Sequence, residues 1–178
     1  MRKNFAIVFA LLLVSATGFA QIPTAGNVYV GYSLAHGSTG FTDTGTLNGW
    51  EGSLEGKIVP YVGIVADVSE QYGTLFDPTF GNVSTRVQDY LFGPRVSFPA
   101  GKFRPYFHVL FGAGHLHESN LNFGSSSDTA FADAIGGGVD YHLVPRVSWR
   151  LQFDDVQNRF YSIRQDNTRF STGLAVSF

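Results

Sequence analysis

Apolar and polar residues alternate along the last eleven residues of the chain, 168–178. One face of this segment is apolar and holds Phe170, Leu174, Val176 and Phe178. The other face holds arginine, serine, glycine and alanine. A period of two is typical of a β-strand whose two faces meet different surroundings. Because the pattern runs to the last residue, we predict that Phe178 belongs to a sheet.

The same alternation recurs along most of the chain and predicts an all-β protein. Eight such segments are found, at residues 27–36, 47–58, 61–70, 85–98, 105–115, 129–142, 146–155 and 168–178. Each is close to the length that a tilted strand needs to cross a membrane, roughly 9–11 residues. An even number of strands of this length is typical of an antiparallel up-and-down transmembrane β-barrel.

The connections between these segments also alternate in length. Three are short, at residues 59–60, 99–104 and 143–145. Four are longer and polar, at residues 37–46, 71–84, 116–128 and 156–167. Outer-membrane barrels have short periplasmic turns and longer extracellular loops. We therefore predict that both termini of the barrel lie on the side of the short turns.

Periodicity alone leaves the apolar face pointing either inward, as in a lipocalin-like soluble barrel, or outward to lipid. The polar face is rich in Gly, Ala and Ser, which suit a narrow interior better than a wetted surface. It also carries isolated charges, at Glu51, Glu55, Lys57, Asp67, Asp89, Arg95, Asp140, Arg150 and Asp154. Charges facing hydrocarbon would cost several kcal/mol each near the midplane, about 2–4 for Arg or Lys. We predict that these nine residues form a charge network in the lumen.

Several aromatic residues fall near the ends of the apolar faces, where membrane proteins concentrate such side chains. These are Trp50, Tyr90, Phe98, Tyr141 and Trp149, together with Phe178. We predict that they line the two membrane interfaces. Asp133 shares the parity of the outward residues, which places it near the rim on the loop side.

The first 20 residues have the pattern of a cleaved secretory signal peptide. Arg2 and Lys3 precede an apolar run at residues 5–14, and the small-x-small sequence Gly18-Phe19-Ala20 follows. The barrel domain is thus expected at residues 21–178. Cysteine is absent, and charged residues make up only 15% of the chain against about a quarter in soluble proteins. No basic patch of the kind that binds nucleic acid is present.

The histidines and serines of the chain are the candidates for other chemistry. His115-Leu116-His117-Glu118 has spacing that can contribute metal ligands, but a site needs further ligands from elsewhere. Ser125-Ser126-Ser127 lies near these histidines in a predicted loop, yet no nucleophile–base pair can be placed. His108, on an inward face, is expected to be hydrogen-bonded. We predict no catalytic residue, metal or cofactor.

The chain resembles the small eight-stranded OmpA-like outer-membrane barrels. The segments that carry the likeness are Pro60-Tyr61-Val62-Gly63, Phe92-Gly93-Pro94-Arg95, residues 136–141, residues 150–154 and the terminal Phe178. The resemblance implies that the outer-membrane assembly machinery reads Phe178. It also implies an inward acid–base set, to which Asp140 and Arg150 correspond. Val65 stands where the family has a further acid, so Glu51, Glu55 or Asp67 would replace it.

These observations predict an integral protein of the bacterial outer membrane with a structural or surface-interaction role. The expected partners are the lipid of that membrane, its assembly machinery and an external partner reached through the loops. Two alternatives remain at this stage. One is a narrow pore for ions or small solutes, and the other is a lipid-modifying enzyme.

Overall fold

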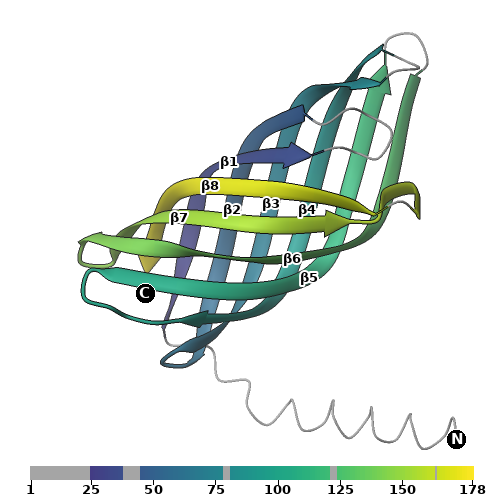
Figure 1. The fold of residues 1–178 in the computed structure, drawn as a ribbon. Helices are drawn as coiled ribbons and strands as arrows, with labels where there is room; N and C mark the ends of the chain where they lie inside the picture. Colours follow the sequence, from purple (N-terminus) through teal and green to yellow (C-terminus); the bar gives the residue numbers. More distant parts are fainter. Residues whose placement is uncertain (1–24, 38–44, 78–80, 121–123, 163) are drawn as a thin grey trace, which may run out of the picture.

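The computed structural model describes residues 25–37, 45–77, 81–120, 124–162 and 164–178, and it is a closed antiparallel β-barrel (Figure 1). Its eight strands are β1 (Gly26–Gly37), β2 (Gly45–Val59), β3 (Val62–Asp77), β4 (Gly81–Ser97), β5 (Phe103–Asn120), β6 (Gly124–Val144), β7 (Val147–Asn158) and β8 (Gln165–Ser177). One 3-10 turn, η2 (Phe160–Ser162), precedes β8. The predicted fold class and strand number are confirmed. The proposed signal peptide, residues 1–20, lies outside the described residues.

Each strand pairs with its neighbours in the chain, and β1 pairs with β8 to close the barrel. In that closing ladder Val28 lies opposite Val176, and Leu34 opposite Phe170. The ladder continues to the end of the chain, where the backbone N–H of Phe178 donates to the carbonyl of Gly26 at 3.1 Å. The terminal residue is therefore part of the sheet, as the alternation predicts.

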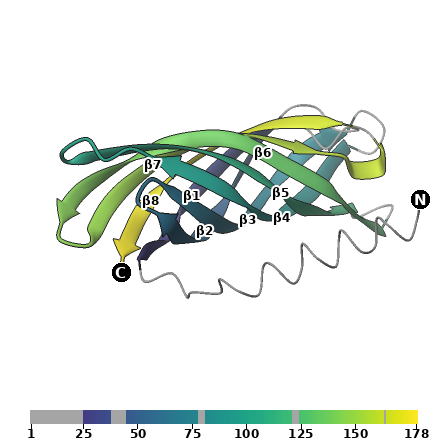
Figure 2. The same ribbon diagram turned by 90° about the horizontal axis from the view of Figure 1, so that it is seen from below.

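The two ends of the barrel differ in their connections. The turns β2–β3 (residues 60–61), β4–β5 (98–102) and β6–β7 (145–146), which the sequence predicts as short, lie at the same end as the C-terminus (Figures 1 and 2). The opposite end carries the connections β1–β2, β3–β4, β5–β6 and β7–β8. We refer to these as the short-turn end and the loop end. Within the described ranges, no helix combines the length and the apolar character needed to cross a bilayer.

The apolar face of every strand points outward. Val30 is 62% exposed and Phe92 is 59% exposed, whereas Glu51, on the opposite face of its strand, is 0% exposed. This distribution is the reverse of that in a soluble protein, where charged residues are almost never fully buried and large apolar ones are. It selects the outward, lipid-facing orientation over the lipocalin-like one.

The strands are longer at the loop end than the sequence predicts. Residues 71–77 belong to β3, 81–84 to β4, 116–120 to β5 and 124–128 to β6, although all of them fall in predicted loops. The prediction of loops there is wrong. Figure 1 shows these strands continuing beyond the end of β1. The remaining loop residues 38–44, 78–80 and 121–123 lie outside the described residues.

The loops were wrongly predicted because the polarity of the strands inverts at this level. Outward positions become polar, as at Arg86 and His117, while inward positions become apolar, as at Leu75, Val87 and Leu116. The last three pack with Leu47 and Phe160 into a buried loop-end cluster. Here the barrel is organised like a water-soluble protein, so the inversion marks where the lipid-facing belt ends.

This boundary makes a prediction about two positions on the outer face of β5. Replacing Phe107, inside the belt, with arginine should destabilise the barrel by about 2–4 kcal/mol, because the charge would face hydrocarbon. Replacing His117, above the belt, with arginine should cost about 0–1 kcal/mol. Urea unfolding in lipid vesicles measures both. Equal losses for Phe107→Arg and His117→Arg would contradict the placement of the boundary.

Candidate functional site: the charge network of the lumen

The lumen is filled by polar side chains that the alternation of the strands turns inward. Eight of the nine predicted lumen residues are buried, and Lys57 is half-buried beside them. Their contacts come from all sides of the barrel, because strands far apart in the chain face each other across the interior. The buried members are Glu51, Glu55, Asp67, Asp89, Arg95, Asp140, Arg150 and Asp154.

Arg169 on β8 is the centre of the largest group of ion pairs. Its Nη2 donates to Asp154 Oδ2 at 2.7 Å, and its Nη1 donates to Asp67 Oδ1 at 3.2 Å. A third carboxylate, Glu51, lies 3.5 Å from Nε. The predicted network omits Arg169. Because Arg169 directly precedes the outward Phe170 on the same strand, the alternation indicates that its side chain points inward. The register places it directly across from Asp154.

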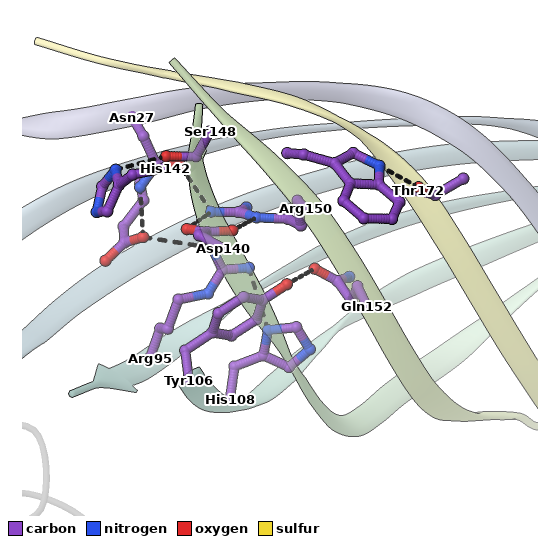
Figure 3. A network of polar contacts seen from close by, with 12 residues as sticks. Asn27, Arg95, Tyr106, His108, Asp140, His142, Ser148, Arg150, Gln152 and Thr172 are labelled. Carbon is purple, nitrogen blue, oxygen red and sulfur yellow. Dashed lines mark hydrogen bonds and ion pairs between the residues drawn. The ribbon is translucent and has the colours of Figure 1, made fainter. Parts of the chain in front are cut away.

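Arg150 and Asp140 form a second, bidentate pair, shown in Figure 3. Arg150 Nε donates to Asp140 Oδ1 at 2.6 Å, and Nη2 donates to Oδ2 at 2.9 Å. Nη2 also donates to the side-chain oxygen of Asn27 at 3.1 Å. Two parallel charge-assisted bonds hold the guanidinium in one plane and orientation. The two residues lie opposite each other on β7 and β6.

Glu55 is the acceptor of a third group, nearer the short-turn end. It forms an ion pair with Lys57 on its own strand, and its Oε2 accepts from Arg95 Nη1 at 3.3 Å. Asn27 Nδ2 donates to the same oxygen at 2.7 Å. Because Asn27 contacts both Glu55 and Arg150, it joins this group to the bidentate pair.

His108 joins these groups to the ion pairs of Arg169. Its Nδ1 lies 3.2 Å from Arg95 Nη2, and its Nε2 lies 2.8 Å from Asp154 Oδ1. A guanidinium can only donate, so Nδ1 accepts and the ring proton sits on Nε2, directed at Asp154. His108 is 1% exposed. It is hydrogen-bonded on both sides, as expected from its inward position.

Tyr106 is a member of the network that sequence reasoning missed. Its ring lies between two guanidinium groups, with the Cζ of Arg95 4.2 Å and that of Arg150 4.9 Å from the ring centroid. Its hydroxyl donates to Gln152 Oε1 at 2.6 Å, and Gln152 in turn donates to Glu51 at 2.6 Å. An aromatic face stabilises cations by about 0.5–2 kcal/mol when they are desolvated.

The glycines of β6 make room for these side chains. A Cβ atom at Gly136 would collide with Asp154 Oδ1, and one at Gly138 would lie 2.7 Å from Tyr106 Oη. Without side chains at these two positions, the tyrosine and the aspartate reach the middle of the lumen.

Acidic groups outnumber basic ones in the described lumen. The acids are the six predicted ones, and the bases of the network are Lys57, Arg95, Arg150 and Arg169, the last of which is not among the predicted residues. Asp89 lies apart from the main network, toward the loop end, where its side chain and that of Asn158 both approach Gly114. Glu51, Glu55 and Asp67 are all buried in the lumen network, and Val65 belongs to a buried apolar cluster.

The predicted interface aromatics all lie on outward positions. Trp50, Tyr90, Phe98, Trp149 and Phe178 are exposed on the outer wall. Tyr141 is partly covered by Phe103, with ring centroids 5.1 Å apart. Their role at the membrane interfaces stays a prediction. Asp133 is half-buried and pairs across the sheet with Phe111.

A polar cluster on the outer wall, centred on Glu70, was not foreseen. Trp50 Nε1 donates to Glu70 Oε2 at 3.2 Å, and Gln88 Nε2 donates to Glu70 Oε1 at 2.6 Å. Arg86 forms an ion pair with the same carboxylate. Burial raises the pKa of Glu70, but the hydrogen bonds from these donors and from Tyr72 outweigh it and hold the pKa below its ordinary 4.5. Glu70 is the first polar residue above the belt on β3.

The histidine candidates His115 and His117 lie on the outer wall, on the same face of β5. His115 Nδ1 lies 2.7 Å from Thr129 Oγ1, and Glu118 falls on the opposite face of the strand from both His115 and His117. Within the described ranges, no group of three or more His, Cys, Asp or Glu residues could hold a metal ion. Ser148 Oγ lies 2.9 Å from His142 Nδ1, but no ion pair joins His142 to a carboxylate in the described part of the chain.

A closed barrel with an apolar exterior and a charged interior defines the class of integral membrane β-barrels, because lipid tolerates no unpaired strand edge. The chain belongs to a known family of this class. The family model described as "Outer membrane protein beta-barrel domain" matches residues 6–178. The protein is therefore an outer-membrane protein, and its short-turn end is periplasmic.

Solved structures share the fold at low sequence identity. Neisserial surface protein A has a TM-score of 0.71 and 13% identity, with 86% of this chain and 99% of that chain covered. Ail of Yersinia pestis has a TM-score of 0.61 and 13% identity, covering 86% and 98%. The N-terminal barrel of Pseudomonas aeruginosa OprF has a TM-score of 0.56 and 15% identity, covering 89% and 100%. No curated protein matches the chain.

The position of Arg169 predicts a large effect of removing it. Arg169→Met should destabilise the barrel by about 3–5 kcal/mol, because buried carboxylates would lose their cation. Removing Asp154 as well, in Arg169→Met/Asp154→Leu, should recover part of the loss, since the two residues are coupled. Urea unfolding measures both variants.

Arg164 supplies the control for this experiment. It pairs with Asp166 at 3.1 Å on the surface, so Arg164→Met should cost about 0–1 kcal/mol. An Arg169→Met barrel as stable as the Arg164→Met barrel would refute the central role of Arg169.

Proposed function

We propose that this protein is a closed outer-membrane barrel whose role is structural or interactive, and that its lumen does not conduct. The continuous network from Lys57 through His108 to Arg169 supports this proposal. Such a network is rigid because each guanidinium is held by several partners in different directions. The loop-end cluster around Phe160 adds a second, apolar obstruction above it.

In this proposal the rigid barrel carries the connections at its outer end to a partner outside the cell. The Ail barrel of Yersinia pestis has been solved in complex with the heparin analogue sucrose octasulfate. That complex supports an external partner for a barrel of this fold. Trimming the four outer connections should abolish binding of this partner, while the trimmed barrel still folds.

The closed lumen can be tested by planar bilayer recording. We expect the wild-type protein to show no regular current steps. Tyr106→Ala/Arg150→Ala should produce steps, because it removes two large side chains that stack on each other inside the lumen. Trp149→Ala is the matched control, since it truncates an aromatic residue on the outer wall. Regular steps from the wild-type protein would favour the narrow pore instead.

We also propose that Phe178 is the signal read by the outer-membrane assembly machinery, after export and cleavage behind Ala20. Its ring is 55% exposed on the outer wall although its backbone is paired with Gly26, so the side chain is accessible within an ordered strand.

Deleting Phe178 separates recognition from folding. We expect the deletion to reduce assembly in cells strongly and refolding in detergent only slightly. The two backbone hydrogen bonds between Phe178 and Gly26 are a small part of the ladder between β1 and β8. Heat-dependent gel mobility reports the folded fraction in both settings. Equal losses in cells and in detergent would argue against a recognition role, and Val176→Ala serves as a control for a general loss of the outer apolar face.

A further inference from the structure

The exposed charges are distributed unequally between the two ends of the barrel. At the loop end acids and bases are mixed, for example Asp166 beside Arg164. At the periplasmic end the charged side chains outside the buried network are all basic in the described residues. They are the exposed Lys102 and Arg146 and the half-buried Arg104 and Lys57. We call these four residues the basic rim.

The basic rim is continuous along neighbouring turns. The backbone N–H of His142 donates to the carbonyl of Lys102 at 2.9 Å, which joins the β4–β5 turn to β6. The N–H of Ser177 donates to the carbonyl of Arg146 at 2.7 Å, which joins the β6–β7 turn to β8. Figure 2 shows the β6–β7 turn and the C-terminus at the same end of the barrel.

The rim also borders a recess with two kinds of wall. Lys57 and Arg104 line one part of it, and Ile58, Val59 and Phe178 line another. The three apolar side chains are at least half exposed, on the lipid-facing side of the barrel. Arg104 Nε has no hydrogen-bond partner in the described structure, and Lys57 is engaged by Glu55.

Arg146 is held in an unfavourable backbone conformation. Its φ is 68°, in the left-handed region, and it follows Pro145 in the tight β6–β7 turn. Glycine is the usual residue at such a position. The β4–β5 turn follows that rule, with Gly101 at φ 64°. An arginine where glycine would be less strained points to a use for its charge.

We propose that the basic rim binds the phosphate headgroups of anionic phospholipids in the periplasmic leaflet. The guanidinium and ammonium groups would neutralise the phosphodiester, while an acyl chain lies against Ile58, Val59 and Phe178. A lipid suits this surface better than a soluble anion, because cationic and apolar groups lie side by side at the edge of the belt. Each Lys or Arg near a membrane surface favours anionic lipid by about 1 kcal/mol, or about fivefold.

The two tryptophans of the chain allow a local measurement at each end. Trp149 lies outward on β7, close to the Arg146 turn, and Trp50 lies near the loop end. Quenching by dibrominated phosphatidylglycerol and dibrominated phosphatidylcholine in vesicles gives the relative association of each lipid beside a tryptophan. We expect a preference for phosphatidylglycerol of about fivefold or more at Trp149, read in Trp50→Phe, and none at Trp50, read in Trp149→Phe.

The decisive variant is Arg146→Gly in the Trp50→Phe background. It should lower the phosphatidylglycerol preference at Trp149 about fivefold while the barrel becomes no less stable, because glycine relieves the turn. Arg146→Lys should keep the preference. Arg164→Gln, which removes one charge from the loop end, should also leave it unchanged.

Four results would overturn the proposal. The first is equal association of the two lipids with Trp149 in the Trp50→Phe protein. The second is an Arg146→Gly barrel whose preference is intact, and the third is an Arg164→Gln barrel that loses as much. The fourth is displacement of phosphatidylglycerol by millimolar inorganic phosphate, which would assign the rim to a soluble anion instead.

Discussion

The closure of β1 onto β8 is the constraint on which the rest of this structure depends. Hydrocarbon offers no partner to a backbone N–H or C=O, so a sheet can cross a membrane only if it has no free edge. Once the ladder from Asn27 to Phe178 is closed, the side chain at every position is committed to one face. A register shift of one residue would turn each valine and phenylalanine of β8 into the lumen and Arg169 into lipid.

Closure also forces the protein to bury many charged groups in a narrow space. The cost of desolvating them is offset only where each charge finds a partner of opposite sign with good geometry. Arg150 does so with Asp140, and Arg169 with Asp154, on adjacent strands. Tyr106 and Gln152 fill the remaining space, which the glycines of β6 leave open. The same side chains therefore satisfy both the polar pairing and the packing of the lumen.

The period of two was enough to predict the strand number, the barrel and the inward position of all nine charged residues. It was not enough to predict strand ends, because the inverted polarity at Leu75 and Arg86 hides the continuing alternation. The period of two also could not predict which charged residues pair with each other across the lumen. That Arg169 meets Asp67 across the lumen depends on curvature and on contacts between strands distant in the chain. Local spacing carries no information about either.

The inversion of polarity has a mechanical consequence. A helix whose apolar stretch does not match the surrounding bilayer can tilt, but a closed barrel with a charged interior is too stiff to do so freely. The belt ends abruptly on β3, where Val68 is followed on the same face by Glu70. The protein therefore cannot shift along the membrane normal without placing Glu70 in oil or Val68 in water. The lipids nearest the wall must stretch or compress to meet it, so the barrel imposes its own thickness on the membrane around it.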